Sequence, residues 1–217
     1  MRSYLLVLRF AVFNVAALAL LVVVWLEGWI TLVIESDITR ITSGIALIFA
    51  VGWLICAHRI FRCSHELNAA VNPDSAAPSR ALWYRDLVDK ARPDGRSAIA
   101  DCLRSRLYAR VVVVRTIANT LITLGLIGTV IGFIIALSGV DANAVADVGA
   151  IGPMVSTLIK GMAVALYTTL VGSVLHVWLL VNYQLLATGT VNLANAIIER
   201  AESPEHFSDT LVTTGHA

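Results

Sequence analysis

Charged residues are scarce in this sequence: they make up 14% of the 217 residues, while hydrophobic residues make up 58%. Soluble domains usually carry about 25% charged residues. The mean hydropathy of +0.79 therefore excludes a water-soluble globular protein, because a chain this apolar needs lipid as its solvent. The net charge of +1 favours no class of partner, and no pattern for nucleic-acid recognition is present.

Cysteines are few as well, and their spacing excludes a disulfide framework. Cys56, Cys63 and Cys102 are odd in number, and Cys56 lies within an apolar run. His58 and His65 follow the first two cysteines, and cysteine and histidine at such short spacing can form a zinc site. On one helix, however, seven residues span about 10 Å, whereas zinc ligands lie within about 2.3 Å of the metal. We expect no metal site and interpret the segment as a helix end at a membrane interface.

Catalytic constellations are also missing. The sequence contains no nucleotide-binding loop, no nucleophile–base arrangement and no carboxylate pair. We therefore expect no enzyme activity, no catalytic residue and no cofactor.

Long apolar runs, in contrast, are abundant. A membrane-spanning helix needs about 20 predominantly apolar residues, and four segments qualify: 5–26, 44–61, 112–139 and 154–186. The first exceeds the roughly 7–15 apolar residues of a cleavable signal peptide, so we expect it to be retained as a span. The predicted fold is an all-α membrane protein with four transmembrane helices and a cytoplasmic helical loop between spans 2 and 3.

The basic residues predict the orientation. Eleven of the sixteen Lys and Arg residues lie between Arg59 and Arg115. The positive-inside rule therefore places the connection between the second and third spans, and with it both termini, in the cytoplasm. The expected parts are 1–61 with the first two spans, 62–110 as a cytoplasmic loop with short helices, 111–186 as a channel-core helix pair, and 187–217 as a partly disordered cytoplasmic tail.

Small residues recur at helical spacing in LGLIGTVIGF (124–133) and in GMAVALYTTLVG (161–172). Each set forms one smooth helix face. Such faces let helix backbones approach closely in a membrane, where no hydrophobic drive pulls helices together. Plain helix packing is the simplest interpretation of both segments. The predicted packing residues are Gly125, Gly128, Gly132, Gly161 and Gly172.

A polar stripe lies beside the second smooth face, because Thr169, Ser173 and His176 follow one another at i, i+4 and i+7. A hydroxyl within a span commonly bonds to a carbonyl one turn earlier, which accounts for any single threonine. Two adjacent threonines that face a third on a neighbouring span can instead line a wet seam for a proton or a stripped cation. The predicted ion-path residues are Thr129, Thr168, Thr169, Ser173 and His176.

Together the two segments resemble the MotA/TolQ/ExbB proton-channel family. The chain carries a GLxGTVxG pattern in one span and a G-[IM]-A-x-A-L-x-x-T-x-x-G pattern in the next, and the similarity covers about 110–186. Four spans with both ends inside resemble the MotA branch. The resemblance implies an ion-channel (A) subunit of a motor in the bacterial inner membrane, which converts proton or sodium motive force into movement.

The resemblance also implies partners and roles. A homopentamer would surround a dimer of a single-span B subunit that brings an intramembrane Asp, and Thr129 and Thr169 would lie beside that Asp, with Thr168 next to them. H⁺ or Na⁺ would be the translocated ion, and a cytoplasmic or envelope protein would be the load. The sequence departs from the TolQ and ExbB pattern at Val164, where they carry a glutamate, and near Trp178, where they carry a proline. Its short cytoplasmic loop argues against a flagellar rotor as the load.

None of the 15 acidic residues lies in the middle of a predicted span. Since a proton pathway usually needs an ionisable group within the membrane, we expect a partner to supply the carboxylate. His176 is the main ionisable exception, and it either relays protons or bonds to a carbonyl. Asn14 and Asn182 are expected to bond across helices.

Several alternatives remain open at the level of sequence. The chain is a non-conducting membrane scaffold if its smooth faces serve only assembly, and an autonomous ion channel or transporter if it conducts alone. The charged loop is a solvated surface, a docking face for a cytoplasmic partner, or a contact with anionic membrane lipid through Arg104, Arg106 and Arg110.

Overall fold

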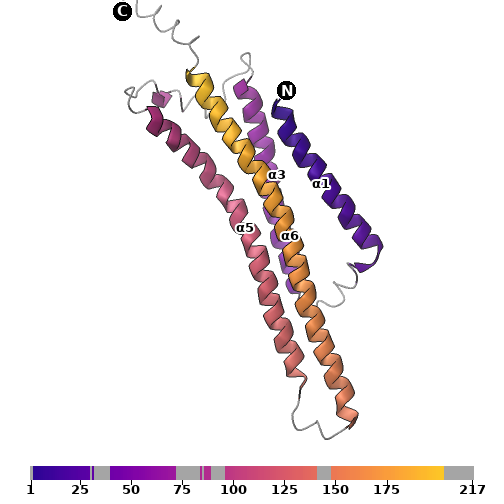
Figure 1. Ribbon diagram of the computed structural model, residues 1–217. Helices are drawn as coiled ribbons and strands as arrows, with labels where there is room; N and C mark the ends of the chain where they lie inside the picture. The colour runs from indigo at the N-terminus through magenta and orange to yellow at the C-terminus, as the bar shows by residue number, and fades with distance from the viewer. Residues whose placement is uncertain are drawn as a thin grey trace, which may run out of the picture. The chain divides into compact units, whose positions relative to one another are not determined.

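Four long α-helices account for nearly all of the residues that the computed structural model describes, which are 2–29, 31, 40–71, 84, 86–88, 96–140 and 148–202. They are α1 (Arg2–Leu26), α3 (Ile41–Val71), α5 (Arg96–Ser138) and α6 (Val148–Glu202) (Figure 1). Each is long and apolar enough to cross a membrane, and no strand occurs in the described part of the chain. The predicted all-α fold with four candidate spans is confirmed, so the chain is a multi-pass membrane protein.

Two of the helices extend well beyond the predicted spans. α5 runs without a break from Arg96, so part of the predicted loop and the third span form one helix. α6 begins at Val148, ahead of the predicted span 154–186, and continues through the first part of the predicted tail. Pro153 lies within α6: a proline inside a helix leaves a backbone hydrogen bond unmade, and α6 continues through it. Residues 72–83, 85 and 89–95 of the predicted loop, and all of 203–217, lie outside the described residues.

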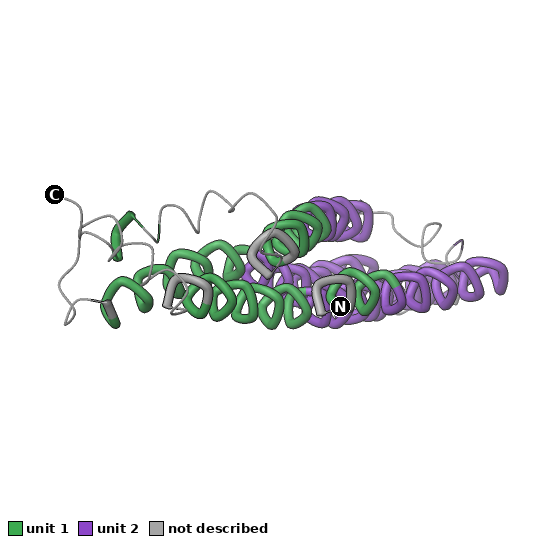
Figure 2. Tube along the Cα trace, turned by 90° about the horizontal axis from the view of Figure 1, so that it is seen from above, with its two compact units in different colours: residues 1–11, 56–113, 183–217 green, residues 12–55, 114–182 purple. Residues whose placement is uncertain are grey.

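One compact unit combines residues 1–11, 56–113 and 183–217 (Figure 2, green). Its apolar core is built from the last turns of α3, the first part of α5 and the last part of α6, with a short helical turn at 86–88. The largest core side chains include Tyr84, Leu103, Leu193 and Ile197, all of which are almost fully buried. The charged segment that follows the second span therefore includes residues that pack in an apolar core.

The second compact unit combines residues 12–55 and 114–182 (Figure 2, purple). Here the outer surface is apolar: Leu126, Val130, Phe133 and Leu137 on one face of α5 are 58–64% exposed. Small residues lie on the opposite, buried face of the same helix. Large apolar side chains thus point outward and small residues point inward. This arrangement is expected where lipid or other spans, rather than water, surround the helices.

A buried polar network joins α1, α3 and α6 inside this second unit. The Asn14 amide Nδ2 donates to Asn182 Oδ1 at 2.8 Å, which confirms the predicted bond across helices. The indole Nε1 groups of Trp53 and Trp178 both donate to Asn14 Oδ1, at 2.8 and 3.0 Å. One amide oxygen accepts two such bonds through its two lone pairs. Because unpaired polar groups are costly in an apolar medium, the network fixes which faces of these helices meet.

Candidate functional site: the seam between α5 and α6

The seam is the line of contact between residues 118–139 of α5 and 157–176 of α6, within the second unit. Close contacts run in antiparallel order along it: Gly125 with Gly172, Gly128 with Thr168, and Gly132 with Ala165. Further along, Ala136 meets Gly161 and Gly139 meets Thr157. The small residues at helical spacing in both segments are thus brought together on one interface.

The approach is too close for side chains at its central positions. A Cβ atom at Gly132 would lie 2.6 Å from the backbone nitrogen of Ala165, and one at Gly161 would lie 2.6 Å from the Cα of Ala136. Both obstacles belong to backbone or to a short side chain, so neither can move aside. The absence of a side chain at these glycines therefore sets the distance between the two helices.

Thr168 lies inside this contact. Its side chain is 1% exposed and packs on Gly128. Its hydroxyl donates to the carbonyls of Val164 at 2.9 Å and Ala165 at 3.1 Å, both within α6. In the single chain, Thr168 fills space between the helices and has no open surface.

Thr169 and Thr129 lie at the edge of the seam and are only half-buried. The Thr169 hydroxyl donates across the seam to the carbonyl of Gly125 at 3.2 Å. The Thr129 hydroxyl donates to the carbonyl of Leu126 at 2.6 Å, and that of Ser173 donates to the carbonyl of Thr169 at 2.7 Å. Each hydroxyl has thereby used its hydrogen, and each oxygen keeps lone pairs that can accept a proton donor or coordinate a cation.

His176 also bonds across the seam. Its Nδ1 lies 2.8 Å from the carbonyl oxygen of Ala118 on α5. A carbonyl can only accept, so Nδ1 is the donor in this bond. Of the two roles left open by the sequence, the bond to a carbonyl is therefore the one observed.

We predict that His176→Asn retains function, because an asparagine amide can supply a donor close to the position of Nδ1 without titrating near neutral pH. The measurement is ion flux in liposomes that contain the complete complex. His176→Leu is the comparison, because it removes the donor and leaves the Ala118 carbonyl with its intrahelical bond alone. Flux that falls equally in both variants would contradict an anchoring role and favour a proton relay.

The acid expected at such a site is absent from the parts of α5 and α6 that form the seam. No Asp or Glu occurs in 114–138 or in 148–182. Val164, at the position where the resemblance suggests a glutamate, is 2% exposed and packed. The seam therefore offers hydroxyl and carbonyl oxygens without a carboxylate of its own.

Some partners in this unit were missed at the level of sequence. Trp53 and Trp178 complete the hydrogen bonds of Asn14, although tryptophans of membrane proteins are ordinarily expected in the aromatic belt at the membrane surface. The available signal was the polar residue itself, since an asparagine in a span needs partners from neighbouring helices.

The last two spans of this helical membrane protein pack through glycine, and hydroxyl groups lie along their seam. The chain matches the MotA/TolQ/ExbB proton channel family over residues 89–199, and it belongs to that family. The match extends the resemblance beyond the seam into the first half of α5 and to near the end of α6. No curated protein and no solved structure matches the chain. The family is a class of channels rather than enzymes, and its members act with partner proteins in channel complexes.

Proposed function

We propose that this chain is the ion-channel (A) subunit of a motor in the bacterial inner membrane. It couples the movement of H⁺ or Na⁺ to mechanical movement, together with a single-span B subunit that brings an Asp into the membrane. The observation that carries the proposal is the seam, which has hydroxyl oxygens at its edge and no carboxylate within 118–139 or 157–176, in a member of a proton channel family. Both termini would lie in the cytoplasm.

The chemistry of the seam suits a carboxyl group supplied from outside. An ionised carboxylate is costly inside a membrane, so it must be protonated or closely solvated as it passes. The lone pairs of Thr129 and Thr169 can accept a hydrogen bond from the neutral acid. When a Na⁺ ion accompanies the carboxylate, the same oxygens can replace part of its hydration shell.

Oligomerisation is part of the proposal. A half-buried seam on one chain becomes a path only when other chains and the partner enclose it. The apolar face of α5 that contains Leu126, Val130, Phe133 and Leu137 is available to neighbouring copies or lipid. A ring, most simply a pentamer around two partner helices, would bring the Thr129 and Thr169 edges toward the partner.

Liposome flux measurements test the proposal directly. We expect ion flux only when this chain is reconstituted with a single-span protein encoded next to it and carrying an Asp near the start of its span. The partner's Asp→Asn variant should conduct no more than empty liposomes, because the hydroxyls of the seam carry no charge of their own. Both H⁺ and Na⁺ gradients are applied, which identifies the ion.

Each of the other outcomes would indicate a different function for this chain. Flux from this chain alone would establish an autonomous channel and remove the need for a partner. An assembled complex without flux under either gradient would establish a non-conducting scaffold, in which the glycine contacts serve assembly only.

A further inference from the structure

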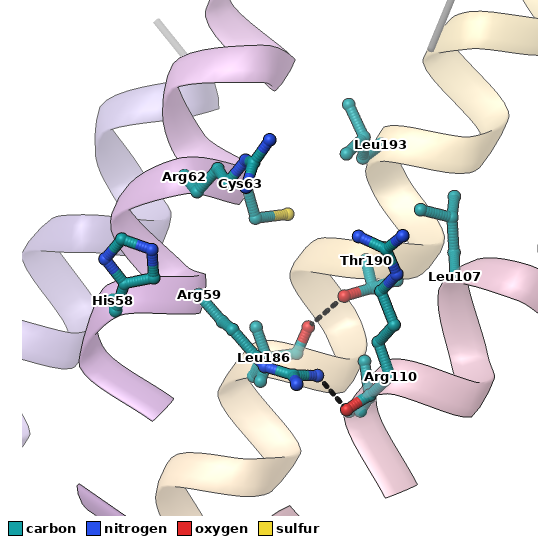
Figure 3. A pocket seen from close by; sticks show the side chains of 10 residues that line it. His58, Arg59, Arg62, Cys63, Leu107, Arg110, Leu186, Thr190 and Leu193 are labelled. Carbon is teal, nitrogen blue, oxygen red and sulfur yellow. Dashed lines mark hydrogen bonds between the residues drawn. The ribbon is translucent and has the colours of Figure 1, made fainter. Parts of the chain in front are cut away.

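A cavity of about 300 Å³ lies between α3, α5 and α6 within the first unit, and none of its lining residues belongs to the seam (Figure 3). Its apolar wall includes Leu107, Val111, Leu186 and Leu193. Its polar wall is basic and consists of His58, Arg59, Arg62 and Arg110. An apolar wall beside a group of cations is the surface expected for an amphipathic anion.

The cavity lies where the spans change from apolar to charged. Arg59 and Arg62 follow the apolar run of the second span, Arg110 directly precedes the valines that open the third, and Leu186 ends the fourth apolar run. Because all three boundaries meet around one cavity, its basic wall lies at the depth of the lipid headgroups. The surrounding excess of Lys and Arg predicts that this is the cytoplasmic leaflet.

The two central guanidinium groups have no acidic partner among the described residues. Arg59 donates to the backbone carbonyl of Arg110, which anchors its side chain across the cavity. In Figure 3 the side chain of Arg59 extends from α3 to the carbonyl of Arg110 on α5, and the side chain of Arg110 extends toward Thr190. Arg62, in contrast, pairs with Glu66 at 3.4 Å. Two cations held near each other repel unless an anion lies between them.

We propose that this cavity binds the phosphate group of an anionic phospholipid, with Arg59 and Arg110 as its ligands. A guanidinium group offers five N–H donors in a planar fork that matches phosphate oxygens, and among the described residues Arg59 uses one of its donors, toward the carbonyl of Arg110. Thr190 does not take part, because its hydroxyl hydrogen is donated to the carbonyl of Leu186 at 2.8 Å. Leu107 and Val111 contact the apolar part of the lipid below the phosphate.

The apolar wall of the cavity favours a lipid over free phosphate. Inorganic phosphate gains nothing from leucine and valine side chains, whereas the glycerol and acyl parts of a lipid bury them. Basic pockets between spans on the cytoplasmic side suit anionic headgroups. The inference does not depend on ion conduction, since lipid binding to this chain alone can be measured without the partner.

Thermal unfolding of the detergent-purified full chain, followed by tryptophan fluorescence, tests the site. The probes are short-chain phosphatidylglycerol, phosphatidylcholine of the same chain length, and inorganic phosphate. Phosphatidylglycerol should raise Tm in a saturable way, and the other two should not. Arg59→Gln and Arg110→Gln should each weaken the apparent affinity roughly tenfold, as expected for the loss of one charge-assisted hydrogen bond.

Arg104→Gln is the matched control, because Arg104 lies exposed on the same helix as Arg110, pairs with Asp101 at 3.3 Å and does not line the cavity. It removes one charge and should leave the affinity unchanged. Arg110→Lys, which keeps the charge but not the fork, should weaken binding less than Arg110→Gln. If both lipids raise Tm equally, or if Arg104→Gln weakens the affinity as much as Arg110→Gln does, the cavity is not the binding site. If only inorganic phosphate raises Tm, the ligand is free phosphate and not a lipid.

Discussion

Gly161→Val is expected to separate the two helices of the seam and to abolish ion flux. A Cβ atom at this position would lie 2.6 Å from the Cα and the Cβ of Ala136, and valine adds two further methyl groups at the same point. The opposing Cα belongs to the α5 backbone and cannot rotate away. Overpacking of this kind costs about 1–3 kcal/mol, and we expect the upper end of that range because two helices must move apart to relieve it.

Two measurements check this expectation: the Tm of the purified chain, and flux in the reconstituted complex. Gly44→Val is the control, because Gly44 also lies within a long apolar helix, α3, and a Cβ atom there meets nothing within 4 Å. Its Tm and flux should remain close to those of the unmodified chain. A Gly161→Val variant with unchanged Tm would show that the helices are not held at the observed distance, and the packing argument for the seam would fail.

The fold was largely predictable because its determinants are local. Length and hydropathy identify a span without knowledge of its neighbours, and a repeat of small residues at helical spacing identifies a close contact. The continuity of α5 from Arg96 follows from the absence of proline or glycine between Gly95 and Gly125. Helix ends were less predictable: α6 begins at Val148, ahead of the predicted span 154–186, and contains Pro153.

The site was less predictable, since it depends on how each helix is rotated about its own axis. Thr168 and Thr169 are adjacent in the sequence and point about 100° apart on a helix. Which of them faces α5 and which lies at the edge is determined by the fit of the glycines on the opposite helix. The same holds for Arg59 and Arg110, which lie on different helices and meet at the cavity only through tertiary packing.

Thr169→Val is expected to reduce ion flux about tenfold or more while leaving the fold intact. The substitution keeps the shape of the side chain and removes the oxygen at the edge of the seam, together with its bond to the carbonyl of Gly125. One hydrogen bond between spans contributes only about 0.6 kcal/mol to stability, so Tm should change little. An interaction with a charged group, such as the carboxyl group as it loses its proton, is worth about 1.5–3 kcal/mol, which corresponds to at least about a tenfold change in rate.

Thr168→Val is the matched control, because the two substitutions are chemically identical and neighbouring. Thr168 is 1% exposed and bonds only to carbonyls of its own helix, and those carbonyls also accept the backbone bonds of α6. Valine fits the same space against Gly128, so both flux and Tm should remain near their original values. If Thr168→Val stops flux and Thr169→Val does not, the ion path runs between α5 and α6 rather than along the edge of the seam. The two helices must then move apart for each ion that passes.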